Sequence, residues 1–324
     1  MVGSQRQLFM LFGAGALFVF LSSSLKVLGS NVSSELAAVP TTLTPKINLV
    51  QAVVLGIVQG LTEFLPISST GHLKVVSVAM GWGNPSIAFT ASLELGSIAA
   101  VLWYFWKDLV QITVGAIKAI QESDYQSHDF RLVLGIGLGT LPIVLFGLLI
   151  KVFIPDFDHS PLRSLSVLAT ASIVMSLLLG LAEKLGKRKR SFKSLGVRDG
   201  ILMGLAQAMA IIPGVSRSGS TLTAGLFMGL ERATDARFSF LLAIPAITLT
   251  GLVELNDALE GGLGDAQLVP LIVGIIFAAV FSYAAIAWLL RFLQTRDTWI
   301  FVWYRLVFGS VILCAIATGL LKNI

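Results

Sequence analysis

Residues 56–73 read GIVQGLTEFLPISSTGHL, and residues 204–221 read GLAQAMAIIPGVSRSGST. Both stretches contain Gly-x-x-Gln, a proline six or seven residues after the glutamine, and then serines and a glycine. Each lies in a longer apolar segment, 48–82 or 199–231, and divides it into two short runs. A helix needs ~20 apolar residues to cross a bilayer, so neither run can span it alone. The pattern predicts an internal repeat of two re-entrant helical hairpins.

The composition indicates a protein that faces lipid. Of 324 residues, 55% are hydrophobic and only 13% are charged, whereas a soluble domain carries about 25% charged residues. Lipid cannot satisfy backbone N–H and C=O groups, so spanning segments must be helices or closed barrels. The chain lacks the ~10-residue alternating segments of a barrel. We therefore expect an all-α integral membrane protein.

Six further apolar stretches have the length of a membrane-spanning helix. They lie at about 87–106, 131–154, 164–185, 236–256, 268–291 and 299–321. One hairpin and three transmembrane helices then form each repeat, about 48–185 and about 199–322. Three is an odd number of crossings, so the second repeat starts from the opposite face of the membrane. The expected fold is two inverted-topology repeats within one membrane domain, residues 46–324.

Residues 1–45 differ from the rest and form an extra N-terminal apolar segment with a linker. Arg6 precedes an apolar run from Leu8 to Leu21, and a Ser/Thr-rich stretch follows that run. A cleaved signal sequence and a retained anchoring helix both fit this pattern. We expect a retained helix, because no small-x-small cleavage site stands out.

Basic residues determine the expected orientation. The net charge of +5 comes with Lys and Arg clustered in short loops, which is typical of the cytoplasmic side and not of a nucleic-acid-binding stripe. The segment Lys184–Arg198 holds seven basic residues and is predicted to be cytoplasmic. The loops at 155–163 and 257–267 are then external. We expect a multi-pass protein with the first hairpin entering from the outer face and the second from the inner.

Polar side chains in the first hairpin are candidates for chemistry, because such groups are costly at membrane depth. Gln59 and Glu63 are four residues apart and share one helix face. Pro66 ends that helix. His72 follows Ser69 by three residues, so both side chains can face one site. Two neighbouring hydroxyl residues fit helix N-caps as well: Ser68 and Thr70.

The second hairpin supplies a guanidinium among hydroxyls and glycines. Arg217 lies between Ser216 and Ser218, and Thr221 follows one turn later. Helix N-termini carry free N–H groups and a partial positive charge, and both attract phosphate. Arg217 adds a fork that can bond two phosphate oxygens. Together the hairpins predict a receptor for a doubly charged diphosphate, and Glu94 is a further candidate partner of this site or of Arg217.

GIVQGLTEFLPISSTGHL and PGVSRSGST resemble the two signature motifs of the undecaprenyl-diphosphate phosphatase family, also called the bacitracin-resistance family. The resemblance covers roughly residues 48–322. It implies hydrolysis of undecaprenyl diphosphate to undecaprenyl phosphate and inorganic phosphate, which recycles the lipid carrier for cell-wall synthesis and confers bacitracin resistance. It also implies inverted repeats, two re-entrant hairpins, a location in the bacterial plasma membrane and a site open to the outer face. The family's functional residues fall on Gln59, Glu63, Ser68, Ser69, His72, Ser216 and Arg217.

A divalent cation, Mg²⁺ or Ca²⁺, is a further implication of the resemblance. Glu63 is its expected protein ligand. Many family members carry Glu where this chain has Gln59, and a neutral amide weakens a site that two carboxylates would share. The phosphates would then supply most of the ligands.

Ser69 is the expected nucleophile, and His72 is the base expected to take its proton. Two roles stay open for Glu63, which would orient His72 or hold the cation. Arg217 would neutralise the transferred phosphoryl group. Attack by a water that His72 activates is the alternative chemistry. The expected substrate-binding residues are Gln59, Ser68, Thr70, Ser216, Ser218 and Thr221.

A secondary transporter or lipid flippase is the rival class, because inverted repeats with broken helices are typical of transporters. Glu63 and His72 have no ionisable counterparts in the second hairpin. Ala210 and Gly219-Ser220 stand there instead, and a symmetric carrier gains little from that difference. A non-catalytic lipid-binding scaffold would not need a Ser-x-x-His pair. We therefore expect an enzyme whose partners are a polyprenyl diphosphate and the bilayer, and not nucleic acid; a homodimer stays open.

Overall fold

Helices form the framework of the described part of the chain. The structure is a computed structural model, and it describes residues 47–83, 87–154, 157, 160–260 and 268–323. In chain order the α-helices are α2 Leu49–Glu63, α3 Ser69–Ala79, α4 Ile87–Tyr104, α5 Trp106–Gln121, α6 His128–Phe153, α7 Leu165–Leu185, α8 Val197–Ala208, α9 Arg217–Phe227, α10 Arg232–Glu260, α11 Leu268–Thr295 and α12 Trp299–Ala317. The predictions for residues 1–45 lie outside the described residues.

Several of these helices are long and apolar enough to cross a membrane. Within the described ranges there are five: His128–Ile150, Leu165–Leu185, Arg232–Val253, Leu268–Thr295 and Trp299–Ala317. A sixth results if α4 and α5 are counted as one bent span. The chain is therefore an all-helical, multi-pass membrane protein, which confirms the fold class expected from composition.

The span expected at 87–106 ends earlier and turns. α4 stops at Tyr104, and the chain bends by 67° before α5 begins. Phe105 fills the corner and is buried. Beyond it, Ile112, Ala116 and Ala119 form the buried face of α5, which packs against α6. Their helical spacing is the amphipathic signal that an apolarity count alone overlooks.

Two short helical hairpins lie where the sequence repeats. The first break, residues 64–68, joins α2 to α3, and the second break, residues 212–216, joins the 3-10 helix η4 (Met209–Ile211) after α8 to α9. The proline of each repeat lies in its break, where it has no N–H to offer a helix. The first break lies against the start of α9, because Ser218 Oγ donates to the Leu65 carbonyl oxygen at 2.8 Å.

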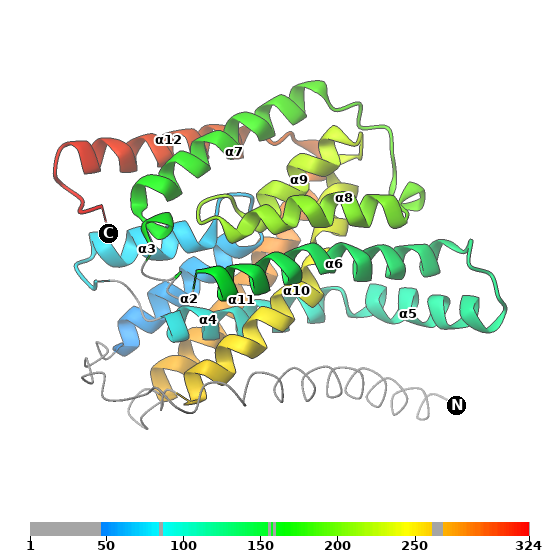
Figure 1. Ribbon diagram of the computed structural model, residues 1–324, viewed down its shortest axis with the longest axis horizontal. Coiled ribbons are helices and arrows are strands. Elements are labelled where there is room, and N and C mark those ends of the chain that lie inside the picture. Colours follow the sequence, from blue (N-terminus) through cyan, green and yellow to red (C-terminus); the bar gives the residue numbers. More distant parts are fainter. Residues whose placement is uncertain (1–46, 84–86, 155–156, 158–159, 261–267, 324) are drawn as a thin grey trace. The chain divides into compact units, whose positions relative to one another are not determined.

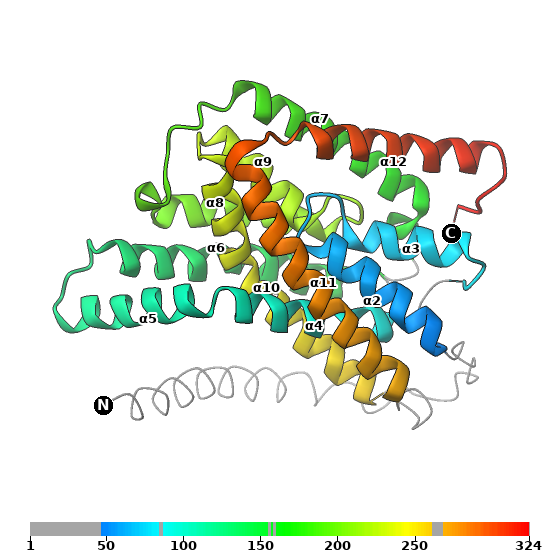
Figure 2. The ribbon, with the colours of Figure 1, turned by 180° about the vertical axis from the view of Figure 1, so that it is seen from behind.

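Glycines let the first helix of each hairpin approach a long apolar helix closely. α2 packs along α11, and α8 packs along α6 (Figures 1 and 2). A Cβ at Gly56 would lie 2.4 Å from the Gly274 carbonyl oxygen, and one at Gly204 would lie 2.0 Å from the Gly139 carbonyl oxygen. Such distances are too short for any larger residue, so these four glycines fix two narrow helix seams.

An apolar cluster places the end of α2. Phe64 directly follows Glu63, and its ring meets that of Phe240 in α10 edge-on, with centroids 5.2 Å apart. Both rings belong to a buried cluster that also contains Phe105 and residues of α11 and α12. Because Phe64 is held in this cluster, the carboxylate of Glu63 has a fixed place beside the two breaks.

Candidate active site

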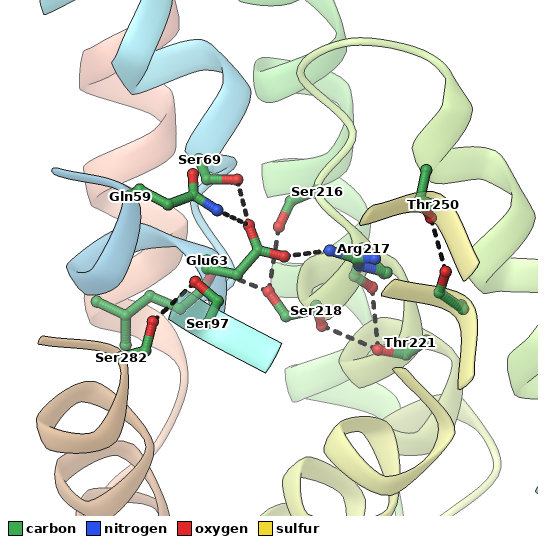
Figure 3. A network of polar contacts seen from close by, with 12 residues as sticks. Gln59, Glu63, Ser69, Ser97, Ser216, Arg217, Ser218, Thr221, Thr250 and Ser282 are labelled. Atoms are coloured by element: carbon green, nitrogen blue, oxygen red, sulfur yellow. Dashed lines mark hydrogen bonds and ion pairs between the residues drawn. The ribbon is translucent and has the colours of Figure 1, made fainter. Parts of the chain in front are cut away.

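Glu63, the last residue of α2, accepts hydrogen bonds from both hairpins (Figure 3). Its Oε2 atom accepts from Gln59 Nε2 at 3.0 Å and from Ser69 Oγ at 2.7 Å. Its Oε1 atom forms an ion pair with Nη2 of Arg217. Gln59 lies one turn before Glu63, and their spacing of four residues predicted this contact. One carboxylate therefore connects the first hairpin to the second.

Arg217 is the first residue of α9 and reaches across to the first hairpin. Its side chain is 17% exposed, and that of Glu63 is 4% exposed. A largely buried ion pair is favourable only when further hydrogen bonds satisfy the remaining oxygens. Gln59 and Ser69 supply these bonds to Glu63. The structure thus pairs Arg217 with Glu63, and the role expected for Glu94 stays a prediction.

Two serines carry matching backbone strain where α3 and α9 begin. Ser68 has φ 76° and Ser216 has φ 71°, a region that residues with a Cβ rarely adopt. Each occupies the N-cap position of the helix that follows. Strain of this kind persists only where the surroundings enforce it, and it concentrates at functional sites. If Ser68 and Ser216 occupy matching positions of the two repeats, the next residues, Ser69 and Arg217, match as well.

The side chains of these two serines differ in what they bond. Ser216 Oγ accepts from the backbone N–H of Gly219 at 3.2 Å, as an N-cap does. Ser68 is buried, but its side chain makes no such capping bond. Helix capping therefore explains the hydroxyl of Ser216 and leaves that of Ser68 without this role.

His72 is directed toward α12 and not toward Ser69. Its Nδ1 atom lies 2.7 Å from the Ser68 carbonyl oxygen, and its Nε2 atom lies 2.6 Å from the hydroxyl of Tyr304. A carbonyl oxygen only accepts, so we assign the proton to Nδ1, and the neutral ring then accepts from Tyr304 at Nε2. Both ring nitrogens are occupied. The hydroxyl of Ser69 bonds Glu63 in place of the expected His72.

Other hydroxyls predicted to bind substrate are bonded to the backbone. Ser218 Oγ donates to the Leu65 carbonyl oxygen at 2.8 Å. Thr221 Oγ1 donates to the Arg217 carbonyl oxygen at 3.0 Å. Thr70, in the first turn of α3, is exposed. Ser218 therefore connects the start of α9 to the first break, and Thr221 bonds within the first turn of α9.

A small pocket opens beside the ion pair. Its lining residues are Glu63, Phe64, Arg217, Ser218, Thr221, Ser239, Phe240 and Ala243. The two hairpins supply most of the polar groups in this wall, and α10 supplies Ser239 together with the apolar Phe240 and Ala243. The guanidinium of Arg217 and the carboxylate of Glu63 thus both border this pocket.

Two neighbouring residues of α12 belong to the site and were missed in the sequence. Tyr304 holds His72, and Arg305 donates to carbonyl oxygens of both breaks. An arginine inside the apolar stretch 299–321 was itself a usable signal, because charged residues at membrane depth mark functional places. Tyr304 carried no comparable signal, since tyrosines are common near the ends of spans.

The described residues do not fit a divalent cation held by protein ligands alone. Among them, no group of three His, Cys, Asp or Glu side chains is placed to hold a metal ion. Both oxygens of Glu63 already accept from Gln59, Ser69 and Arg217. Mg²⁺ and Ca²⁺ take about six or more oxygen ligands, and a lone carboxylate supplies few of them. The expected Mg²⁺ or Ca²⁺ stays a prediction.

The fold and site together define a class of protein. Apolar helices of membrane-spanning length surround a largely buried cluster of hydroxyl, carboxylate and guanidinium groups, formed where two hairpins meet. This is a multi-pass membrane protein with a polar site suited to an anionic group. Residues 52–311 match the family described as bacitracin resistance protein BacA. The chain belongs to this family.

Curated relatives are similar along most of the chain. A protein of Nostoc sp. named undecaprenyl-diphosphatase is 68% identical over 278 residues, which are 86% of this chain and 87% of the relative. A protein of the same name from Trichodesmium erythraeum is 60% identical over 284 residues, 88% of this chain and 91% of the relative. One from Gloeobacter violaceus is 55% identical over 283 residues, 86% of this chain and 96% of the relative.

Proposed function

We propose that this protein hydrolyses undecaprenyl diphosphate to undecaprenyl phosphate and inorganic phosphate. The observation that carries the proposal is the cluster of Ser69, Glu63 and Arg217 in one buried site. It combines a nucleophile, a base and a phosphate-binding cation. The name shared by relatives at 55–68% identity supports the same activity. The product is the lipid carrier of cell-wall synthesis, and the family is named for bacitracin resistance.

Substrate binding begins with an exchange of partners at Arg217. A diphosphate carries more negative charge than one carboxylate, and a guanidinium can bond two of its oxygens at once. The diphosphate therefore draws Arg217 away from Glu63, while the N-terminus of α9 contributes N–H groups. Arg217 then lies against the transferred phosphoryl group and stabilises its charge. Glu63 keeps its bonds to Gln59 and Ser69.

Ser69 attacks the terminal phosphorus, and Glu63 takes its proton. Ser69 Oγ already donates to Glu63 at 2.7 Å, a distance at which a general base can act. The Oγ–P bond forms as the bond to the bridging oxygen breaks, and undecaprenyl phosphate leaves with that oxygen. The geometry favours Glu63 over His72 as the base in this step, because Ser69 is bonded to the carboxylate.

His72 acts in the second step, in which water hydrolyses the phosphoserine. Its Nε2 atom accepts a hydrogen bond from Tyr304 and is therefore the ring nitrogen that can take a proton. When a water replaces the Tyr304 hydroxyl at Nε2, His72 becomes the base for that water. The Oγ–P bond breaks as the water oxygen bonds phosphorus, Glu63 returns its proton to Ser69 Oγ, and inorganic phosphate leaves while His72 gives up the water proton. Water activation by His72, which the sequence offered as an alternative to a serine nucleophile, here completes the serine pathway.

We also propose that the fold consists of two inverted-topology repeats with re-entrant hairpins. Two matched features support this arrangement. The seam of Gly56 with Gly274 has its counterpart in the seam of Gly204 with Gly139. Ser68 and Ser216 likewise match, each at positive φ before the second helix of its hairpin. The first hairpin would enter from the outer face and the second from the inner.

The proposed location is the bacterial plasma membrane, with Lys184–Arg198 in the cytoplasm and the site open to the outer face. Clustered basic residues favour the cytoplasmic side. Within that segment Arg190 donates two hydrogen bonds of 2.8 Å to Asp199, which raise the pKa of Arg190 and keep it charged. The asymmetry between the hairpins, with Glu63 and His72 in the first alone, supports an enzyme over a symmetric carrier. A homodimer stays a prediction.

Phosphate release tests the proposal directly. The purified full-length chain, in detergent or in nanodiscs, should release inorganic phosphate from undecaprenyl diphosphate and none from undecaprenyl phosphate. Ser69→Ala protein, prepared in the same way, controls for contaminating phosphatases. If monodisperse parent protein releases no more phosphate than the Ser69→Ala control, the proposed function is wrong.

A further inference from the structure

Arg305 is a fully buried arginine on α12, with 1% of its surface exposed. It lies inside an apolar helix of membrane-spanning length, Trp299–Ala317. A charged side chain in such a place is costly, so its partners indicate what it is for. The hydrolysis steps proposed above do not use it.

The hydrogen bonds of Arg305 go to backbone carbonyl oxygens. Nη1 donates to Pro66 at 3.0 Å, in the first break. Nη2 donates to Gly214 at 2.7 Å and to Val215 at 3.0 Å, in the second break. Nε donates to Ser172 of α7 at 3.3 Å. One side chain thus bonds both breaks and a neighbouring transmembrane helix.

We propose that Arg305 is a positioning residue, which holds the two breaks in the register at which Ser69 and Glu63 face Arg217. This inference rests on the proposed function, because it concerns the residues that would carry out hydrolysis. The three bonded carbonyl groups of the breaks lie outside α2, α3, η4 and α9, so no helix fixes their directions. A guanidinium presents its N–H groups in a rigid plane and fixes directions as well as distances.

The Nη atoms of the Arg305 guanidinium contact the backbone of the two hairpins and not the pocket. A Cβ at Gly219 would lie 2.6 Å from Nη1 of Arg305, so the guanidinium lies tightly against the first turn of α9. Arg305 does not line the pocket beside Glu63, whereas Arg217 does. Arg217 can therefore meet a substrate, while Arg305 acts on the segments that carry Arg217 and Ser69.

A residue that positions the reacting groups and a residue that binds substrate affect the kinetic constants differently. Loss of a group that binds substrate equally before and during the reaction raises KM, whereas misplacement of the reacting groups lowers kcat. Arg305→Lys keeps the positive charge but offers one nitrogen where arginine offers three. We expect kcat to fall by roughly 30- to 100-fold, with KM within about threefold of the parent value.

A distance measurement tests the same inference without relying on activity. Spin labels on cysteines at Leu61 and Ile212, both substantially exposed near the two breaks, report the separation of the hairpins. Cys314→Ala supplies the cysteine-free background. The parent and Arg217→Lys should give one narrow distance distribution, because both keep the carbonyl bonds of Arg305. Arg305→Lys should give a broadened distribution.

The proposal is supported only if kcat falls and the distance distribution broadens. A rise in KM with kcat unchanged would make Arg305 a substrate-binding residue. A fall in kcat with an unchanged distance distribution would give Arg305 a direct role in the reaction. Either result overturns the proposal, and so does an Arg305→Lys protein that matches the parent in both measurements. Arg305→Gln, which keeps two N–H donors, is the second variant if the lysine variant does not fold. Failure of the parent to release phosphate would refute the proposed function, while the label distances would still test positioning.

Discussion

The side chain of Arg217 contributes geometry as well as charge. It pairs with Glu63 and borders the pocket, so a bound diphosphate would take its place as partner. Arg217→Lys keeps the charge but loses the bidentate fork. We expect turnover to fall by on the order of 100-fold, as for other single stabilising donors. Steady-state phosphate release measures this change, and near-parent turnover would show that the fork is unimportant.

Ser69 and Glu63 should act as one unit, because the carboxylate accepts the serine proton. Ser69→Ala and Glu63→Gln should each remove most of the phosphate release, and the double variant should be little worse than either. Ser68→Ala is the neighbour control and should lose less activity, since Ser68 is assigned neither the attack nor the proton transfer. An active Glu63→Gln protein would return the role of base to His72.

His72→Ala separates the two proposed steps. If His72 serves the hydrolytic water, this variant should still transfer phosphate to Ser69 and then stall. A phosphorylated enzyme should accumulate on incubation with undecaprenyl diphosphate labelled in its terminal phosphate. Intact-protein mass spectrometry would detect it, and Ser69→Ala/His72→Ala should remain unmodified. A dead His72→Ala enzyme without a phosphoserine would place His72 in the first step.

At the scale of elements, the glycine seams determine where the hairpins lie. Gly204→Ala puts a Cβ 2.0 Å from the Gly139 carbonyl oxygen, so α8 must move away from α6. Overpacking of this kind costs about 1–3 kcal/mol. The thermal midpoint in detergent should fall, and activity should fall with it. Gly137→Ala on α6 is the matched control, because its Cβ would meet nothing within 4 Å. Equal midpoints for the two variants would contradict a tight seam.

At the scale of the whole molecule, the orientation of the loops can be measured in cells. In a Cys314→Ala background, Leu162→Cys should react with a membrane-impermeant thiol reagent in intact cells, whereas Lys189→Cys should react only after lysis. Leu162 is exposed before α7, and Lys189 belongs to the basic segment after it. The reverse labelling pattern would overturn the proposed orientation.

Local spacing predicted the parts of the site that lie on one helix. The contact between Gln59 and Glu63 follows from four residues of helix, and each of the two breaks follows from its proline. Ser69 and Glu63 lie on opposite sides of a break, so their contact depends on turn geometry that spacing does not reveal. The spacing of Ser69 and His72 predicted a pair, but spacing does not show which atoms the two ring nitrogens of His72 bond. In the structure they bond the Ser68 carbonyl oxygen and the Tyr304 hydroxyl.

Contacts between distant segments could not be read from the sequence. Tyr304 reaches His72 across 232 residues, and Arg305 bonds both breaks through backbone atoms that every residue shares. The side chains of the breaks therefore do not indicate that their carbonyl groups bond Arg305. The bend at Phe105 was hidden because apolar residues continue across it from α4 into α5, where only their periodicity changes.

The ion pair of Glu63 and Arg217 also bears on the electrical insulation of the cell. Two polar breaks that meet inside a bilayer are a route by which protons or other ions could leak and discharge the proton-motive force. Glu63 and Arg217 neutralise one another and are largely closed off from solvent, so the resting site holds no unbalanced charge between them. Proteoliposomes with the parent protein should therefore keep a pH gradient as long as empty liposomes do. A faster decay would show that the resting site conducts ions.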